Sequence, residues 1–223
     1  MANHFHLYLI RHGQSANNSL EESQRVEDPG LTEIGEHQAQ LLAERFQHRK
    51  ITHLLTSGFL RAVQTMRPLA DCLKLQPEIW TDLHEVGGCY QGHQPGKLEG
   101  RPGMNRETLT SRFPEFKLPA DIDERGWWKS QPFESYQQAK QRAERQSRKL
   151  LNEFHGTGAT VACVIHADFK ALLLESFVPN ERHSLVPADL VNTGVTLLRC
   201  SVERVGVLEF NDAGHLREEL ITS

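Results

Sequence analysis

The sequence has few cysteines, and none of them forms a metal-binding pattern. Its four cysteines are scattered along 223 residues, with no CxxC pair and no His/Cys spacing typical of a zinc site. The first residues, MANHFHLYLIRHG, contain neither the basic segment nor the small-residue cleavage site of a secretory signal. We therefore expect a cytoplasmic protein with reduced thiols and no bound metal.

Long apolar runs and an excess of basic charge are also missing. The longest apolar run is only a few residues, whereas a membrane helix needs about 20. The 25 Lys and Arg residues face 29 Asp and Glu residues, which gives a net charge of −4. Proteins that bind nucleic acid or anionic membranes usually carry a basic excess, so we expect neither partner.

Apolar, β-prone segments alternate with segments of helical periodicity along most of the chain. Strands are predicted at residues 5–10, 53–56, 78–80, 160–165, 190–198 and 202–210. Helices are predicted at residues 32–46, from a cap at Ser57 to residue 73, at 134–154 and at 169–177. This order predicts an α/β fold, a three-layer α/β/α sandwich with a mainly parallel sheet, whose last two strands are antiparallel neighbours.

One segment, at about residues 86–133, interrupts the alternation. It is rich in glycine and proline and contains the pair Trp127-Trp128. A long irregular segment inside a compact domain usually has a function. We therefore expect a single domain over residues 1–223 with a lid insertion at 86–133, including a short helix near residues 106–113. The two tryptophans either line the substrate entrance or staple the lid.

Charged side chains follow four of the predicted strands at their carboxyl ends, which is where ligands bind in open α/β sheets. Arg11 and His12 end the first strand, Arg61 lies in the first turn after the second, Glu85 follows the third, and His166 ends the fourth. Each residue alone has an ordinary explanation as a turn or surface residue. Together they predict a phosphate monoester site, because guanidinium groups match phosphate oxygens bidentately.

The motif RHGQSANN at residues 11–18 resembles the RHGxSxxN signature of the histidine phosphatase superfamily, also called the phosphoglycerate mutase-like family. The resemblance continues in the family's order and covers nearly the whole chain outside the lid. Its further blocks are LTEIGEHQA, TSGFLRAVQT, LHEVGG, VIHAD and NTGVTLL. Five further ordered blocks make the resemblance far more specific than RHG alone.

The resemblance implies a covalent mechanism without metal or cofactor. His12 would attack phosphorus and become a phosphohistidine, and Glu85 would protonate the leaving oxygen and then activate water. The phosphoryl group would be held by Arg11, Asn18, Arg61 and His166. The expected partner is a small-molecule phosphate ester, and a homodimer is one option for assembly.

The sequence departs from the family after the second histidine. The family usually reads HGG, whereas this chain reads His166-Ala167-Asp168. A carboxylate that faced the pocket would repel phosphate. We therefore expect Asp168 to cap the following helix and to point away from the pocket.

Three functions fit this constellation, and phosphate monoester hydrolysis is favoured. Phosphoglycerate mutases carry an ERHYG-type block after the acid glutamate, but here Glu85 is followed by VGGCY. Mutase-type phosphoryl transfer and non-catalytic phospho-ligand binding stay as alternatives, and the intact His12 and Glu85 argue against the second. A P-loop is excluded because GHQPGKL has the wrong glycine spacing and Leu98 where Ser or Thr is needed. A second anionic group on the substrate could meet the lid's Lys97, Arg101, Arg106, Arg112, Arg125 or Lys129.

Overall fold

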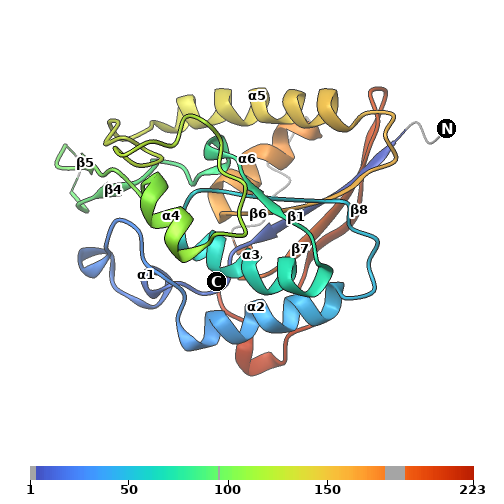
Figure 1. Ribbon diagram of the computed structural model, residues 1–223, viewed down its shortest axis with the longest axis horizontal. Coiled ribbons are helices and arrows are strands. Elements are labelled where there is room, and N and C mark those ends of the chain that lie inside the picture. Colours follow the sequence, from blue (N-terminus) through green and yellow to red (C-terminus); the bar gives the residue numbers. More distant parts are fainter. Residues whose placement is uncertain (1–3, 95, 179–188) are drawn as a thin grey trace.

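The computed structural model describes residues 4–94, 96–178 and 189–223 (Figure 1). A six-stranded sheet crosses the molecule in the order β3-β2-β6-β1-β7-β8. These strands are β1 (Phe5–Arg11), β2 (His53–Thr56), β3 (Pro77–Ile79), β6 (Thr160–Ile165), β7 (Val195–Cys200) and β8 (Val205–Asp212). The first four are parallel to one another, and β7 and β8 are antiparallel neighbours, as predicted.

Helices cover both faces of this sheet (Figure 1). Helices α2 (Glu33–Phe46) and α3 (Leu60–Leu73) lie on one face, and α5 (Tyr136–Phe154) and α6 (Ala167–Phe177) lie on the other. Strand β1 shows why both faces are buried. Tyr8 and Ile10 belong to the core beneath α2 and α3, whereas Leu7 and Leu9 belong to the core beneath α5 and α6. The predicted three-layer sandwich is confirmed.

Among the predicted boundaries that are wrong, two are decided by distant contacts. Helix α3 begins at Leu60 and is capped by Asp28, whose Oδ1 accepts from the Leu60 amide at 2.9 Å, rather than by Ser57. Strand β7 begins at Val195 instead of residue 190. Thr193 adopts a positive φ of 54°, and its amide donates to the carbonyls that end β1, so the preceding chain turns toward the site.

The segment predicted as a lid, residues 86–133, contains short elements, and its helix and tryptophans pack on the α2–α3 side of the sheet. Strands β4 (Tyr90–Gln91) and β5 (Glu99–Gly100) pair with each other, and α4 (Arg106–Arg112) matches the predicted short helix. Trp127 and Trp128 are both buried, and the ring centroid of Trp127 lies 4.7 Å from that of Phe59. Neither tryptophan lines the pocket described below. The structure therefore agrees with the alternative that the two tryptophans pack this segment onto the rest of the domain.

Short helical turns complete the chain: α1 (Ala16–Ser19), η1 (Glu22–Gln24), η2 (Thr81–Leu83) and η3 (Glu218–Leu220). Two of them position the site, because α1 and η1 follow directly on the RHG motif and form one wall of the pocket. Within the described ranges, no helix has both the length and the apolar character needed to cross a membrane.

Candidate active site

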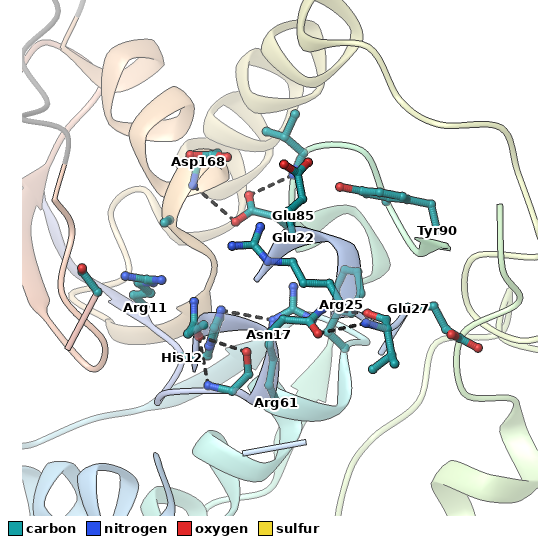
Figure 2. Close-up of a pocket in the computed structure, with 18 of the residues that line it drawn as sticks. Arg11, His12, Asn17, Glu22, Arg25, Glu27, Arg61, Glu85, Tyr90 and Asp168 are labelled. Atoms are coloured by element: carbon teal, nitrogen blue, oxygen red, sulfur yellow. Dashed lines mark hydrogen bonds between the residues drawn. The ribbon is translucent and has the colours of Figure 1, made fainter. Parts of the chain in front are cut away.

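A pocket of about 390 Å³ lies at the carboxyl end of the parallel strands (Figure 2). Arg11, His12, Asn18, Arg61 and Glu85 all line it. The sixth predicted site residue, His166, is fully buried, and its ring centroid lies 5.0 Å from that of His12. The fold therefore brings all six predicted site residues together from four separate parts of the chain.

His12 is held in one tautomer and one orientation. Its Nδ1 donates to the carbonyl of Gly13 at 2.7 Å, which leaves the lone pair on Nε2. Arg61 Nε donates to this Nε2 at 3.1 Å. Burial, reinforced by the charges of Arg61 and Arg11, holds the pKa of His12 well below its usual value, so the ring is neutral near pH 7. A neutral imidazole is what nucleophilic attack requires.

Close backbone packing fixes the loop that carries His12. A Cβ placed on Gly13 would lie 2.6 Å from the Gly35 carbonyl oxygen, so only glycine fits this approach of the loop to α2. The Gly13 amide donates to Thr65 Oγ1 at 2.9 Å, and Asn192 Nδ2 donates to the His12 carbonyl at 3.0 Å. The loop that carries His12 is thus anchored to α2, α3 and the turn before β7.

Several polar atoms around the pocket lack a protein partner. Among the described residues, Arg11 Nε and His166 Nδ1 are buried without a hydrogen bond, although Arg11 also donates to the Leu190 carbonyl. His166 Nε2 is paired with Ser57 Oγ at 2.7 Å. Buried polar atoms are rarely left unpaired in proteins. Phosphoryl oxygens bound beside His12 are acceptors suited to such donors.

Asn18 contributes an amide to the same wall. Its Oδ1 accepts from the amide and the hydroxyl of Ser15, both at 2.9 Å, which closes the turn after the RHG motif. The side-chain carbonyl of Asn18 is thus already hydrogen-bonded within the protein. Its NH₂ group is the part that can donate to a ligand in the pocket.

Glu85 lies at the N-terminus of α6. Its Oε1 accepts from the amides of Val86 and Phe169, each at 2.9 Å, and its Oε2 accepts from the Asp168 amide at 3.4 Å. Burial raises the pKa of Glu85, and the nearby Asp168 carboxylate raises it further, whereas these amides and Arg61 oppose the shift. A raised pKa favours the protonated form that a general acid needs.

A family comparison agrees with this geometry. The model of the histidine phosphatase superfamily (branch 1) matches residues 7–213. The chain belongs to this superfamily.

Individual proteins are similar to this chain over only part of its length or at low sequence identity. A Yersinia enterocolitica protein named probable phosphoglycerate mutase GpmB is 35% identical over 125 residues, which is 53% of this chain and 58% of that protein. The match therefore spans little more than half of the curated relative. Bacillus stearothermophilus YhfR has a TM-score of 0.67 at 21% identity, over 96% of this chain and 100% of that one. Mycobacterial glucosyl-3-phosphoglycerate phosphatase has a TM-score of 0.61 at 18% identity, over 94% of this chain and 100% of that one. At these identities, the two structures establish a shared histidine phosphatase fold.

Asp168 departs from the prediction made for it. It lies in the first turn of α6, yet its side chain caps nothing, because His166 is the N-cap residue and Glu85 accepts from the free amides of the helix. Asp168 is exposed and lines the pocket beside Glu85 (Figure 2). The expectation that it points away is wrong, because a carboxylate from another segment already occupies the capping position.

The outer part of the pocket contains residues that the sequence did not single out. Asn17, Glu22, Arg25 and Glu27 come from the chain around η1, and Tyr90 comes from β4. The sequence marked this first segment only as polar, and no spacing signal relates it to the RHG motif. The six lid cations considered above do not line the pocket. Arg25 is its outer cation instead.

The described residues contain no group of three or more His, Cys, Asp or Glu side chains arranged to hold a metal ion. The positive charge around the pocket comes from guanidinium groups, with Arg11 and Arg61 nearest to His12.

Proposed function

We propose that this chain is a metal-independent phosphatase that hydrolyses small phosphate monoesters through a phosphohistidine on His12. The observation that carries the proposal is the fixed tautomer of His12, whose Nδ1 donates to the Gly13 carbonyl while Nε2 meets Arg61 inside the pocket. Phosphoryl transfer depends mainly on positioning and on neutralising charge. Arg11 and Arg61 offer that charge without a metal.

In the first half-reaction, His12 Nε2 attacks phosphorus and the ester P–O bond breaks. The incoming phosphoryl group replaces the Arg61–His12 hydrogen bond, so the guanidinium can turn to a phosphoryl oxygen. The leaving alkoxide takes the proton of Glu85. The raised pKa of Glu85, caused first by burial, keeps that proton available.

In the second half-reaction, the ionised Glu85 accepts a proton from water, and the resulting hydroxide attacks phosphorus. The P–N bond breaks, which releases inorganic phosphate and regenerates neutral His12 and protonated Glu85. The lowered pKa of His12 makes the ring a good leaving group in this step. Arg11 and Arg61 neutralise the phosphoryl charge throughout.

Mutase activity is the second candidate, because the Yersinia relative carries a mutase name. A mutase returns the phosphoryl group to a bound phosphorylated acid and needs cations for the acid's second anionic group. Val86, Gly88, Tyr90 and Gly92 line the pocket after Glu85, and none of them is cationic. Arg25 also lines the pocket, but the carboxylates of Glu22, Glu27 and Asp168 outnumber it, so the lining favours hydrolysis.

The test is rapid-quench labelling with a ³²P-labelled monoester, comparing the wild type, His12→Asn and the surface control His53→Asn. We expect label on His12 in the wild type and in the control, and none in His12→Asn. Label on another residue overturns the proposal, and binding without phosphate release identifies a non-catalytic module. With 3-phosphoglycerate and a bisphosphoglycerate primer, 2-phosphoglycerate formed at about 1–10³ s⁻¹ identifies a mutase instead.

A further inference from the structure

The pocket has two halves of opposite character. Its inner half contains His12 between the guanidinium groups of Arg11 and Arg61. We call the other half the outer pocket and define it by the lining residues Asn17, Glu22, Arg25, Glu27, Tyr90 and Asp168. A phosphate ester bound at His12 places its alcohol in this outer pocket. The charges there therefore bear on which alcohols can bind.

The outer pocket contains more negative than positive charge. Glu22, Glu27 and Asp168 are carboxylates, and Arg25 is the cation that faces them (Figure 2). Within the described residues, none of the three carboxylate groups accepts a hydrogen bond or forms an ion pair, and the Arg25 guanidinium donates no hydrogen bond and forms no ion pair. These groups are therefore available to a ligand. Asn17 is different, because its amide is paired with the backbone of Val26 at 2.7 and 3.0 Å.

Asp168 is the carboxylate nearest to the chemistry. Its backbone amide contacts Glu85 Oε2 at 3.4 Å, and its side chain lines the same cavity as Arg11 and His12. An alcohol leaving from phosphorus passes next to Glu85 and so comes within range of Asp168. A second anionic group on that alcohol would meet a like charge there, whereas a hydroxyl or ammonium group would find an acceptor.

We propose that the outer pocket selects phosphate monoesters whose alcohol carries hydrogen-bond donors, hydroxyl or ammonium groups, and that it discriminates against esters with a second anionic group. The proposal rests on the phosphatase activity proposed above and narrows its substrate class. The carboxylates accept from the donors of the alcohol, and Arg25 donates to its hydroxyl oxygens. Phosphorylated carboxylic acids and bisphosphates fit this half poorly.

Three two-carbon esters test the proposal: phosphoethanolamine, ethyl phosphate and 2-phosphoglycolate share a phosphorylated CH2 group, to which an aminomethyl, a methyl and a carboxylate group are attached. We expect kcat/KM to fall in that order, with phosphoglycolate at least about tenfold below phosphoethanolamine, the order expected for one like-charge contact near solvent. Glycerol 3-phosphate should likewise exceed 3-phosphoglycerate. Equal or higher kcat/KM for the two carboxylates overturns the proposal.

Variants assign the effect to the outer pocket. Asp168→Asn and Glu22→Gln should each raise the phosphoglycolate to ethyl phosphate ratio of kcat/KM several-fold, whereas Glu153→Gln, at an exposed position on α5, should leave the ratio unchanged. The ratio cancels any effect of Asp168 on Glu85 that is common to both esters. An unchanged ratio in both pocket variants overturns the proposal.

The two proposals fail in different ways. If p-nitrophenyl phosphate is hydrolysed but the kcat/KM values of the three esters do not fall in the expected order, only the proposed substrate class is wrong. If p-nitrophenyl phosphate is not hydrolysed and no phosphohistidine forms, the phosphatase activity is wrong. The selectivity of the outer pocket is then measured by calorimetric binding of the same three esters, and affinities without the expected order overturn it as well.

Discussion

At the scale of single residues, His12 and Glu85, the two groups of the proposed reaction, lie in environments of opposite effect. Burial and two guanidinium groups lower the pKa of His12, and burial with the Asp168 carboxylate raises the pKa of Glu85. The pocket thus favours the unprotonated ring of His12 and the protonated form of Glu85. Environments that push two pKa values apart are how a site assigns base and acid roles.

A prediction at this scale concerns Glu85→Gln, which removes the proton donor but keeps size and polarity. The rate of the first step on an alkyl phosphate should fall by about 10²–10⁴-fold, the usual contribution of general acid–base catalysis. On p-nitrophenyl phosphate the fall should be much smaller, because nitrophenolate leaves without protonation. The pre-steady-state burst reports this step alone. Equal losses for both esters would mean that Glu85 is not the acid.

His84 is the titratable neighbour of Glu85 in the chain, and its position argues against a role as the acid. It is buried beside Trp127 and Trp128, and its Nδ1 donates to the Glu85 carbonyl at 2.8 Å. Burial and the charge of Arg142 lower the pKa of His84 to about 3, so the ring is neutral near pH 7 and lacks the imidazolium proton that a general acid would give. It also does not line the pocket.

At the scale of elements, helix α5 positions the chain that carries Glu85. Arg142 on α5 is 2% exposed and donates to the carbonyls of Asp82 and His84 at 2.7 and 3.0 Å. Two further nitrogens of the Arg142 guanidinium donate to the two carboxylate oxygens of Glu134, at 2.8 and 2.6 Å. The guanidinium also lies 4.0 Å from the Phe169 ring centroid. Arg142 therefore holds both the segment before Glu85 and the helix whose amides bind the Glu85 carboxylate.

A prediction at this scale is that Arg142→Lys disturbs the acid step more than the rest of the reaction. Lysine keeps the charge but cannot form the bidentate fork and the two carbonyl bonds together. We expect the ratio of alkyl to nitrophenyl phosphate turnover to fall about tenfold, beyond any common loss. Arg148→Lys, at an exposed position on the same helix, is the control. A lower melting temperature with an unchanged ratio would mean a structural role only.

At the scale of the whole molecule, a buried lysine behind the pocket limits stability. Lys170 on α6 is fully buried, and its Nζ donates to the Gly194 carbonyl at 2.8 Å, in the turn that supports β1. Burial, reinforced by the charge of Arg11, lowers the pKa of Lys170 from 10.5 to about 7. The folded protein therefore disfavours the charged form that the unfolded chain retains.

This buried lysine predicts how stability changes with pH. Between about pH 7 and pH 10.5 the unfolded chain binds the Lys170 proton more tightly than the folded protein does, so the unfolding free energy should rise with pH. Relative to Lys170→Met, the wild type should gain up to about 1.4 kcal/mol per pH unit in this window. Urea unfolding from pH 7 to 9.5 measures the difference, with the exposed Lys140→Met as control. A flat difference contradicts the prediction.

Much of the site could be predicted from the sequence, because its residues belong to short motifs that directly follow predicted strands. Arg11 and His12 follow an apolar strand directly, and His166 follows another. Parallel strands bring their carboxyl ends to one edge, so local patterns sufficed to place these residues together. The periodicity of the helices likewise determined which faces pack on the sheet.

Only the tertiary structure decided which partner each polar group takes. Asp168 faces the pocket because Glu85, 83 positions earlier, already caps α6. Asp28 caps α3 across 32 positions, and Arg25 reaches the pocket from a segment without a distinctive pattern. A sequence motif encodes the backbone around it, whereas hydrogen bonds and charges across the pocket depend on where distant segments meet. The motifs therefore determined the family and its candidate nucleophile, and the folded chain decided the charge of the surface that meets the substrate.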